Sequence, residues 1–132
     1  MMRYKGIVVG AGRVGAFYDK PRDARTLTHC HAFAKNPRVE LAGIVDVDAS
    51  QRVAAAERWE APAFASVDAA MHAVAPHIVS VCTPTSTHLR VVEEAAAGRP
   101  RFLFLEKPIG ARQGDAARVG ALLREAAIAC MV

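Results

Sequence analysis

Short apolar runs alternate along the chain with longer stretches in which apolar residues recur at helical spacing. The runs that have the length of strands cover residues 5–9, 39–46, 63–65, 78–83, 101–105 and 128–132. The helical stretches cover residues 28–35, 49–59, 67–74, 87–97 and 113–127. This alternation is typical of βαβ units, whose strands are parallel and covered on both faces. We therefore expect a doubly wound, three-layer α/β domain of the Rossmann type, with strand order 3-2-1-4-5-6.

Single residues mark several of the predicted boundaries. Ser66 is a suitable N-cap for the helix at 67–74, and Gly98 stands where a left-handed C-cap is expected after the helix at 87–97. The segment 18–25 does not fit a minimal βαβ unit, because it is charged and contains the helix breaker Pro21. We expect this segment to be a mobile, solvent-facing loop between two helical pieces, near the ligand edge of the sheet.

Composition narrows the class of protein. The chain has 132 residues, 52% hydrophobic and 23% charged, so we expect residues 1–132 to form one domain. Its net charge is +4, but the basic residues are scattered among acidic ones. This pattern favours a solvated surface with an anionic cofactor site over a nucleic-acid interface. No apolar run approaches the roughly 20 residues of a membrane span, and no signal peptide is evident, so neither a membrane partner nor export is expected.

The cysteines indicate a reducing compartment. Cys30, Cys82 and Cys130 are odd in number and not closely paired, and two of them lie in apolar runs. We expect buried free thiols in the cytoplasm rather than disulfides. His29-Cys30-His31 has the residue types of a metal site, but three adjacent side chains cannot all point at one ion without further ligands. We therefore expect no metal, and we expect these residues to pack along a helix.

A glycine-rich loop follows the first strand and opens a helix. In the sequence Gly10-Ala11-Gly12-Arg13-Val14-Gly15, the first glycine permits a tight turn, the second lets backbone approach a pyrophosphate, and the third lets helix and strand pack closely. Unpaired amides at the helix N-terminus then face the phosphates. An acidic residue at the end of the next strand strengthens the prediction of a dinucleotide site, although an S-adenosylmethionine site would share several of these features.

Asp46 ends the second strand, where its carboxylate can accept hydrogen bonds from both hydroxyls of the adenosine ribose. The same charge would repel a 2′-phosphate, so the sequence favours NAD over NADP. Its spacing from Gly15 exceeds the usual value of about 20 residues, which the charged segment explains. For Asp48, two residues later, we expect only the role of an acidic residue at the start of the next helix. Arg13 or Arg52 could bind a 2′-phosphate, so NADP is the alternative cofactor.

The fourth strand also ends in polar residues at this edge. Thr83, Pro84 and His88 close the strand and open a helix, on the same side of the sheet as the glycine loop. We expect all three to contact the cofactor. The alternative for His88 is an ordinary surface position in the first turn of its helix.

The fifth strand is followed by Glu106-Lys107-Pro108, at the sheet edge where open parallel sheets bind ligands. Lys107 can hydrogen-bond a substrate hydroxyl or carbonyl and assist proton transfer, so it is the predicted catalytic residue and a predicted cofactor contact. Glu106 can position Lys107 or simply cap the strand, and it is included among the cofactor-binding residues. Pro108 fixes the exit from the strand and is a candidate for a cis peptide bond.

Together these motifs resemble the N-terminal half of the glucose-fructose oxidoreductase and inositol dehydrogenase family (Gfo/Idh/MocA). The matching pieces are residues 10–15, 39–46, 82–84 with His88, and 106–108, and they span almost the whole chain. The resemblance implies hydride transfer between a nicotinamide cofactor and a sugar or cyclitol hydroxyl. It implies that Lys107 is the active-site lysine, that Asp46 binds ribose, and that Thr83, Pro84 and His88 lie beside the nicotinamide.

The same resemblance sets limits on what this chain does alone. In the family, a second domain supplies an open-faced sheet, the substrate contacts and usually a catalytic histidine with a nearby aspartate. We expect that domain to be absent here, and the chain to be an NAD(P)-binding domain that is inactive by itself. Its partners would be the dinucleotide, a sugar-like substrate once a second domain is supplied, and another copy of itself if it forms a homo-oligomer. The alternative is a stand-alone, non-catalytic dinucleotide-binding module that senses or scaffolds.

Overall fold

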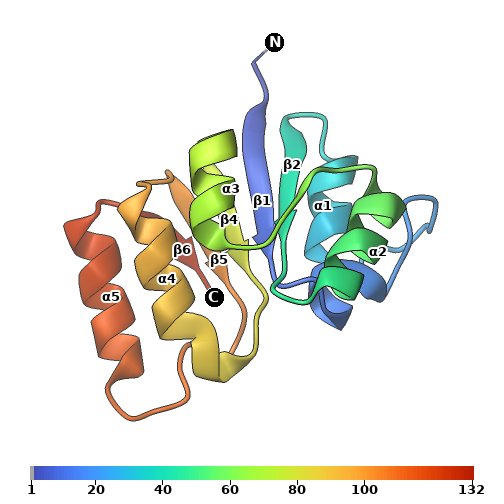
Figure 1. The fold of residues 1–132 in the computed structure, drawn as a ribbon. Coiled ribbons are helices and arrows are strands. Elements are labelled where there is room, and N and C mark those ends of the chain that lie inside the picture. The colour runs from blue at the N-terminus through green and yellow to red at the C-terminus, as the bar shows by residue number, and fades with distance from the viewer. Residues whose placement is uncertain (1) are drawn as a thin grey trace.

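The computed structural model describes residues 2–132 and contains one parallel sheet. Its strands are β1 (Tyr4–Val9), β2 (Val39–Val45), β3 (Ala63–Phe64), β4 (Ile78–Val81), β5 (Phe102–Leu105) and β6 (Ala129–Met131). Their order in the sheet is β3-β2-β1-β4-β5-β6, which confirms the predicted topology (Figure 1).

The connections between the strands are helical. The helices are α1 (His29–Lys35), α2 (Ala49–Trp59), α3 (Val67–Val74), α4 (His88–Ala97) and α5 (Asp115–Glu125), with two shorter turns, the π-helix η1 (Arg13–Phe17) and the 3-10 turn η2 (Thr85–Thr87). In Figure 1, α3, α4 and α5 lie in front of the sheet. α1 and α2 pack on the opposite face, so the three-layer prediction is confirmed.

The central strand β1 is buried from both sides. Ile7 and Val9 pack into the core beneath α3, α4 and α5, whereas Val8 packs into the core beneath α1 and α2. Alternate side chains of a strand point to opposite faces, so a strand covered on both faces must be apolar at consecutive positions. This explains the consecutive apolar residues Ile7, Val8 and Val9 at the end of β1.

The ends of the helices show one correct and one incorrect prediction. The Ser66 hydroxyl accepts a hydrogen bond from the Ala69 amide at 3.1 Å, as an N-cap does. Gly98 is not a left-handed cap, because its φ is −83° and the following Arg99 takes the positive φ of 51°. A Cβ on Gly98 would instead collide with the Cε of Met71 on α3. Gly98 therefore lies directly against α3, and a side chain at this position would have to displace the flexible end of Met71.

The segment between η1 and α1 is non-helical, as predicted, but it is not solvent-facing throughout. Residues 20–27 are exposed, whereas Asp19 is only 2% exposed. The Arg58 guanidinium on α2 donates hydrogen bonds to the carbonyl oxygens of Phe17 and Asp19, each at 3.2 Å. The start of the segment is thus fixed to α2, and the prediction of a wholly solvent-facing loop was wrong at this point.

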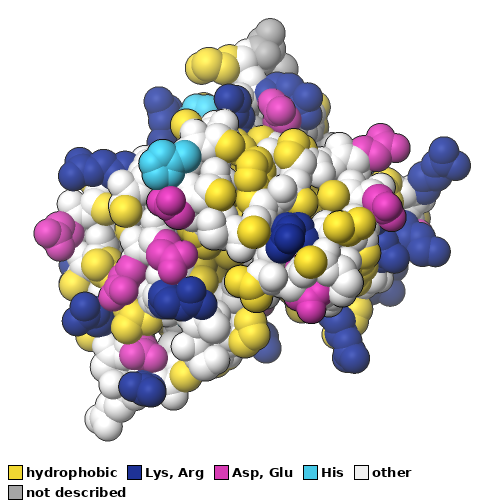
Figure 2. Space-filling view, in the orientation of Figure 1, with side chains coloured by type: hydrophobic (Ala, Val, Ile, Leu, Met, Phe, Trp, Pro, Cys, Tyr) yellow, Lys and Arg dark blue, Asp and Glu magenta, His cyan; other side chains and the backbone are white. Residues whose placement is uncertain are grey.

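Within residues 2–132, no helix is long and apolar enough to cross a membrane. Figure 2 shows basic and acidic side chains interspersed over the face formed by α3, α4 and α5, without a single-sign stripe on that face.

Candidate functional site

A cleft of about 900 Å³ lies at the carboxyl ends of β1, β2 and β4. The molecule is hollowed there, between the turn after β2 on one side and the start of α4 on the other (Figures 1 and 2). This volume is within the range of ligand pockets. The predicted residues that line the cleft are Gly10, Gly12, Arg13, Val14, Asp46, Thr83 and Pro84. Segments far apart in the sequence therefore meet where the sequence placed a cofactor.

Each glycine of the loop has a distinct structural reason. Gly10 has a positive φ of 98°, and a Cβ there would lie 2.7 Å from the carbonyl group of Cys82. A Cβ on Gly15 would collide with the carbonyl oxygen of Gly10. A Cβ on Gly12 would meet no atom within 4 Å, because that position faces the open cleft. No protein atom within residues 2–132 would prevent a larger side chain at this position. The lack of a side chain at Gly12 is therefore explained by a ligand that approaches the backbone here.

The helix that follows the loop is a π-helix of five residues rather than the start of a longer α-helix. The amides of Ala16 and Phe17 both donate to the carbonyl oxygen of Gly12, at 2.9 and 3.1 Å. The amides of residues 13–15 have no acceptor in the part of the chain that the structure describes. Unpaired amides at a helix start suit an anionic group such as a pyrophosphate.

Asp46 is half-buried and holds the end of β2 against the glycine loop. One of its carboxylate oxygens accepts a hydrogen bond from the Ala11 amide and the other from the Asp48 amide, both at 2.8 Å. The Arg52 guanidinium donates to the backbone carbonyl of Asp46 at 2.8 Å and does not line the cleft. Of the two candidate ligands for a 2′-phosphate, only Arg13 therefore lines the cleft.

Asp48 has the structural role that its position suggested. Its carboxylate caps α2 by accepting a hydrogen bond from the Gln51 amide at 2.9 Å, and it also accepts one from the Ser50 hydroxyl at 2.6 Å. These two bonds, the Ser50 hydroxyl foremost, lower the pKa of Asp48.

His88 lies beneath the cleft instead of lining it. The ring is only 1% exposed, with Nε2 at 2.9 Å from the carbonyl oxygen of Thr83 and Nδ1 at 3.0 Å from that of Pro108. His88 therefore joins the turn after β4 to the segment after β5. The alternative of an ordinary surface position in the first turn of α4 was wrong.

Lys107 is exposed on the segment that follows β5 and makes no hydrogen bond or ion pair within residues 2–132. The peptide bond between Lys107 and Pro108 is cis. The half-buried Glu106 approaches His29, with 2.8 Å between Oε1 and Nε2. Neither Glu106 nor Lys107 lines the cleft, but β5 is the direct neighbour of β4, whose end does.

The side chains of His29, Cys30 and His31 diverge from one another. His29 reaches Glu106 on β5, Cys30 is buried in the core beneath α1, and His31 bonds to Asp19 at 2.7 Å. Within residues 2–132, no three metal-ligating side chains come together. Neither histidine contact could be predicted from the sequence, because Glu106 lies 77 residues from His29 and Asp19 lies 12 residues from His31.

All three cysteines are free thiols. Cys30 is buried and Cys82 is half-buried, but Cys130 is exposed because it lies on the edge strand β6, so the expectation of burial was wrong for Cys130. Burial raises the pKa of Cys82 well above its usual value, and the nearby negative charge of Glu106 raises it further. Cys82 therefore presents a neutral, weakly polar thiol to the cleft.

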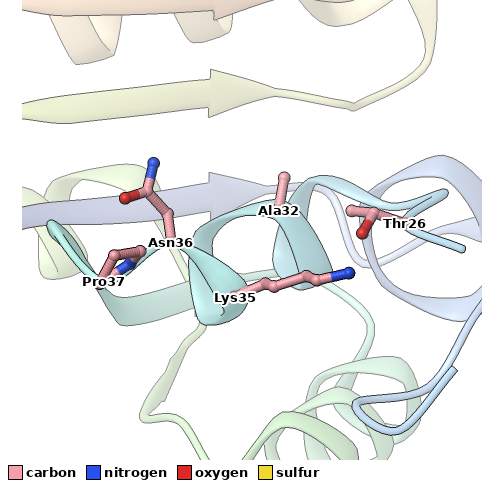
Figure 3. A pocket seen from close by; sticks show the side chains of 5 residues that line it. All are labelled: Thr26, Ala32, Lys35, Asn36 and Pro37. Atoms are coloured by element: carbon pink, nitrogen blue, oxygen red, sulfur yellow. The ribbon is translucent and has the colours of Figure 1, made fainter. Parts of the chain in front are cut away.

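A second, shallower hollow of about 360 Å³ lies along α1 (Figure 3). Its lining residues are Thr26, Ala32, Lys35, Asn36 and Pro37. None of the predicted site residues contributes to it, and Lys35 is its only charged side chain.

Comparison with known proteins agrees with this geometry. Residues 5–132 match the oxidoreductase family with an NAD-binding Rossmann fold, GFO_IDH_MocA. UDP-N-acetylglucosamine 3-dehydrogenase of Acidithiobacillus ferrooxidans is 33% identical over 108 residues, which are 82% of this chain and 29% of that protein. A crystal form of this dehydrogenase superimposes with a TM-score of 0.80 at 28% identity, over 98% of this chain and 38% of that one.

A more distant structure shows the same fold. The WlbA dehydrogenase of Chromobacterium violaceum, solved in complex with NADH and UDP-GlcNAcA, superimposes with a TM-score of 0.84 at 24% identity. All of this chain is covered, but only 35% of that protein. The chain thus spans about a third of the length of the relatives it matches. On the match over residues 5–132, it belongs to the Gfo/Idh/MocA oxidoreductases and is an NAD-binding Rossmann domain of that family.

Proposed function

We propose that this chain is the cofactor-binding part of a dehydrogenase that transfers hydride between NAD and a hydroxyl-bearing carbon of a sugar or cyclitol. The observation that carries the proposal is the cleft in which the glycine loop, the Asp46 carboxylate and the Thr83–Pro84 turn converge. In an open parallel sheet, a dinucleotide binds across this edge.

The cleft suits each part of the cofactor in turn. The unpaired amides of residues 13–15 would receive the pyrophosphate, and Asp46 would accept hydrogen bonds from the adenosine ribose. Thr83 and Pro84 would lie toward the nicotinamide, with His88 holding their turn from beneath. Arg13 lines the same cleft and is the residue that could weaken the preference for NAD over NADP.

Lys107 is the proposed catalytic residue. Its ammonium group is exposed and has no partner within residues 2–132, so it is free to hydrogen-bond a substrate oxygen. An amine in that position can take part in proton transfer to or from the reacting hydroxyl. Glu106 is too closely engaged with His29 to be the first choice for a cofactor ligand.

Nucleotide-linked sugars are the first substrates to test, because the relative that is 33% identical is named for UDP-N-acetylglucosamine. We expect residues 1–132 alone to oxidise no sugar at a measurable rate, since orientation of the reacting groups supplies about 7–11 kcal/mol of a barrier and this chain spans only about a third of the length of the dehydrogenases it matches. The free thiols fit a reducing cytoplasm, and a homo-oligomer stays a prediction.

Calorimetric titration of the chain with NADH, NADPH and S-adenosylmethionine tests the proposal. We expect NADH to bind most tightly. Absence of NADH binding, or tighter binding of S-adenosylmethionine, would overturn the assignment. Equal binding of NADH and NADPH would refute the role of Asp46 and direct attention to Arg13.

A further inference from the structure

The segment that carries Lys107 is fixed from two sides by histidines. His88 approaches the carbonyl oxygens of Pro108 and Ile109, at 3.0 and 3.3 Å, from beneath the cleft. His29, the first residue of α1, approaches the Glu106 carboxylate on the opposite face of the sheet. His29 does not line the cofactor cleft, so its contact with Glu106 needs a separate explanation.

The His29 ring is itself held on three sides. Nε2 lies 2.8 Å from the Glu106 carboxylate, and Nδ1 lies 3.1 Å from the hydroxyl of Ser80 on β4. The ring also packs edge-on against Phe104, with 6.4 Å between ring centroids. Ser80 is completely buried, so its hydroxyl is a fixed partner. A neutral imidazole satisfies this arrangement when Nε2–H donates to Glu106 and the Ser80 hydroxyl donates to Nδ1.

Glu106 still belongs to the sheet. Its amide donates to the carbonyl oxygen of Val81 at 3.0 Å, so the β-ladder continues one residue beyond β5. Alternate residues of a strand face opposite sides. Leu105 packs under α4 and α5, whereas Phe104 and Glu106 face α1, so Lys107 directly follows a residue that is held on the α1 face.

We propose that His29 is a positioning residue for Lys107. By holding the Glu106 carboxylate on the α1 face, it fixes the direction in which the backbone leaves the sheet and thus where the lysine amine lies. The inference rests on the proposed function only in giving Lys107 a substrate to act on. Without His29, the segment keeps the His88 contact but loses its anchor on the other face.

Backbone ¹⁵N relaxation of the 132-residue chain tests this directly. In the original protein we expect order parameters near 0.85 at the Lys107 and Ile109 amides, as in rigid backbone, and in His29→Leu we expect values below about 0.6. His29→Gln should restore the order, because its amide can reach the same carboxylate. His72→Leu is the control, since His72 is an exposed histidine on α3 whose contacts lie within its own helix.

Glu106→Ala provides an independent route to the same result. It removes the contact from the other end at a half-buried position, so it should leave the fold intact and lower the same order parameters. The double variant with His29→Leu should show no further loss. Unchanged order at Lys107 in either single variant would overturn the proposal, as would failure of His29→Gln to restore it.

Titration of the same variants with NADH separates this inference from the proposed function. We expect the affinity for NADH to change by less than twofold in His29→Leu, because the residue lies outside the cleft. A tenfold loss of NADH affinity would show that His29 supports cofactor binding instead and would overturn the positioning role. Failure of the original chain to bind NADH would refute the proposed function, while the relaxation result would still decide the role of His29.

Discussion

Replacing Asp19 should destabilise this protein more than replacing Asp23, the other carboxylate in the segment between η1 and α1. The carboxylate is 2% exposed and accepts hydrogen bonds from the amides of Leu27 and Thr28, at 2.5 and 3.2 Å. It also accepts one from the Thr28 hydroxyl at 2.6 Å and contacts His31 Nδ1 at 2.7 Å. These bonds close the segment and attach it to the first turn of α1.

The expected cost follows from this geometry. A hydrogen bond to a charged group contributes about 1.5–3 kcal/mol, and removal of one partner from a buried charged pair costs about 3–5 kcal/mol. The bonds of Asp19 form one network, so their energies do not add, and we expect Asp19→Ala to lower the free energy of unfolding by about 3–5 kcal/mol. Asp19→Asn keeps the shape and loses the charge, so its cost should be about half as large.

The effect of Asp19 should depend on pH. Burial raises the pKa of the carboxyl, but the hydrogen bonds from Thr28, Leu27 and His31 outweigh burial and lower it below 3.8 in the folded protein. A lowered folded-state pKa means that the stabilisation is complete above the unfolded value and is lost as the pH falls through the folded value. The difference in stability between the original protein and Asp19→Asn should therefore be constant at neutral pH and shrink below about pH 4.

Urea unfolding at pH 7 and at pH 3 measures both effects. With an m-value of about 2 kcal/mol per molar urea, Asp19→Ala should lower the midpoint at pH 7 by about 1.5–2.5 M. Asp23→Ala is the matched control, because Asp23 lies in the same segment, is exposed and accepts one hydrogen bond, from the Lys20 amide. That variant should lose less than about 0.5 kcal/mol. A loss below 1 kcal/mol for Asp19→Ala, or one equal to that of Asp23→Ala, would refute the reasoning.

Three further predictions concern the cleft and the segment beside it. Asp46→Ala should narrow the preference for NADH over NADPH by at least tenfold in calorimetric titration, and an unchanged ratio would show that the carboxylate does not meet the ribose. Gly12→Val should weaken NADH binding at least tenfold with an unchanged circular dichroism spectrum, because its side chain would enter the open cleft; undiminished binding would mean that no ligand approaches this position. Limited proteolysis should cut first within residues 20–27, which are exposed and non-helical, and a first cut elsewhere would contradict this.

The topology and most of the cleft could be predicted because their signals are local. An apolar run with helical segments on either side identifies a buried parallel strand. Gly10 is favoured by its own positive φ, and Gly15 is constrained by the carbonyl oxygen of Gly10 in the same turn. Asp46, Thr83 and Pro84 could be placed together because parallel strands bring their carboxyl ends to one edge.

The remaining features depend on partners that are distant in sequence. The sequence predicts a helix cap at Gly98, but the residue lies against Met71 of α3. For Glu106 the sequence offers positioning of Lys107 or a strand cap, and it does not indicate the contact with His29. The charge of Asp19 suggested an exposed position, but a carboxylate can be buried when enough donors surround it. Composition and periodicity carry no information about such pairings.

The place of β1 at the centre of the sheet affects how this chain is made. β1 pairs with β2 on one edge and with β4 on the other, and about 72 residues separate Val9 from Val81. At a synthesis rate of about 5–20 residues per second, the ribosome needs roughly 4–14 s to add them. Throughout that interval one edge of the central strand, whose last four residues are buried in the folded protein, has no partner. Nascent chains of this protein are therefore expected to engage chaperones at β1, and slower translation before β4 should increase aggregation instead of reducing it.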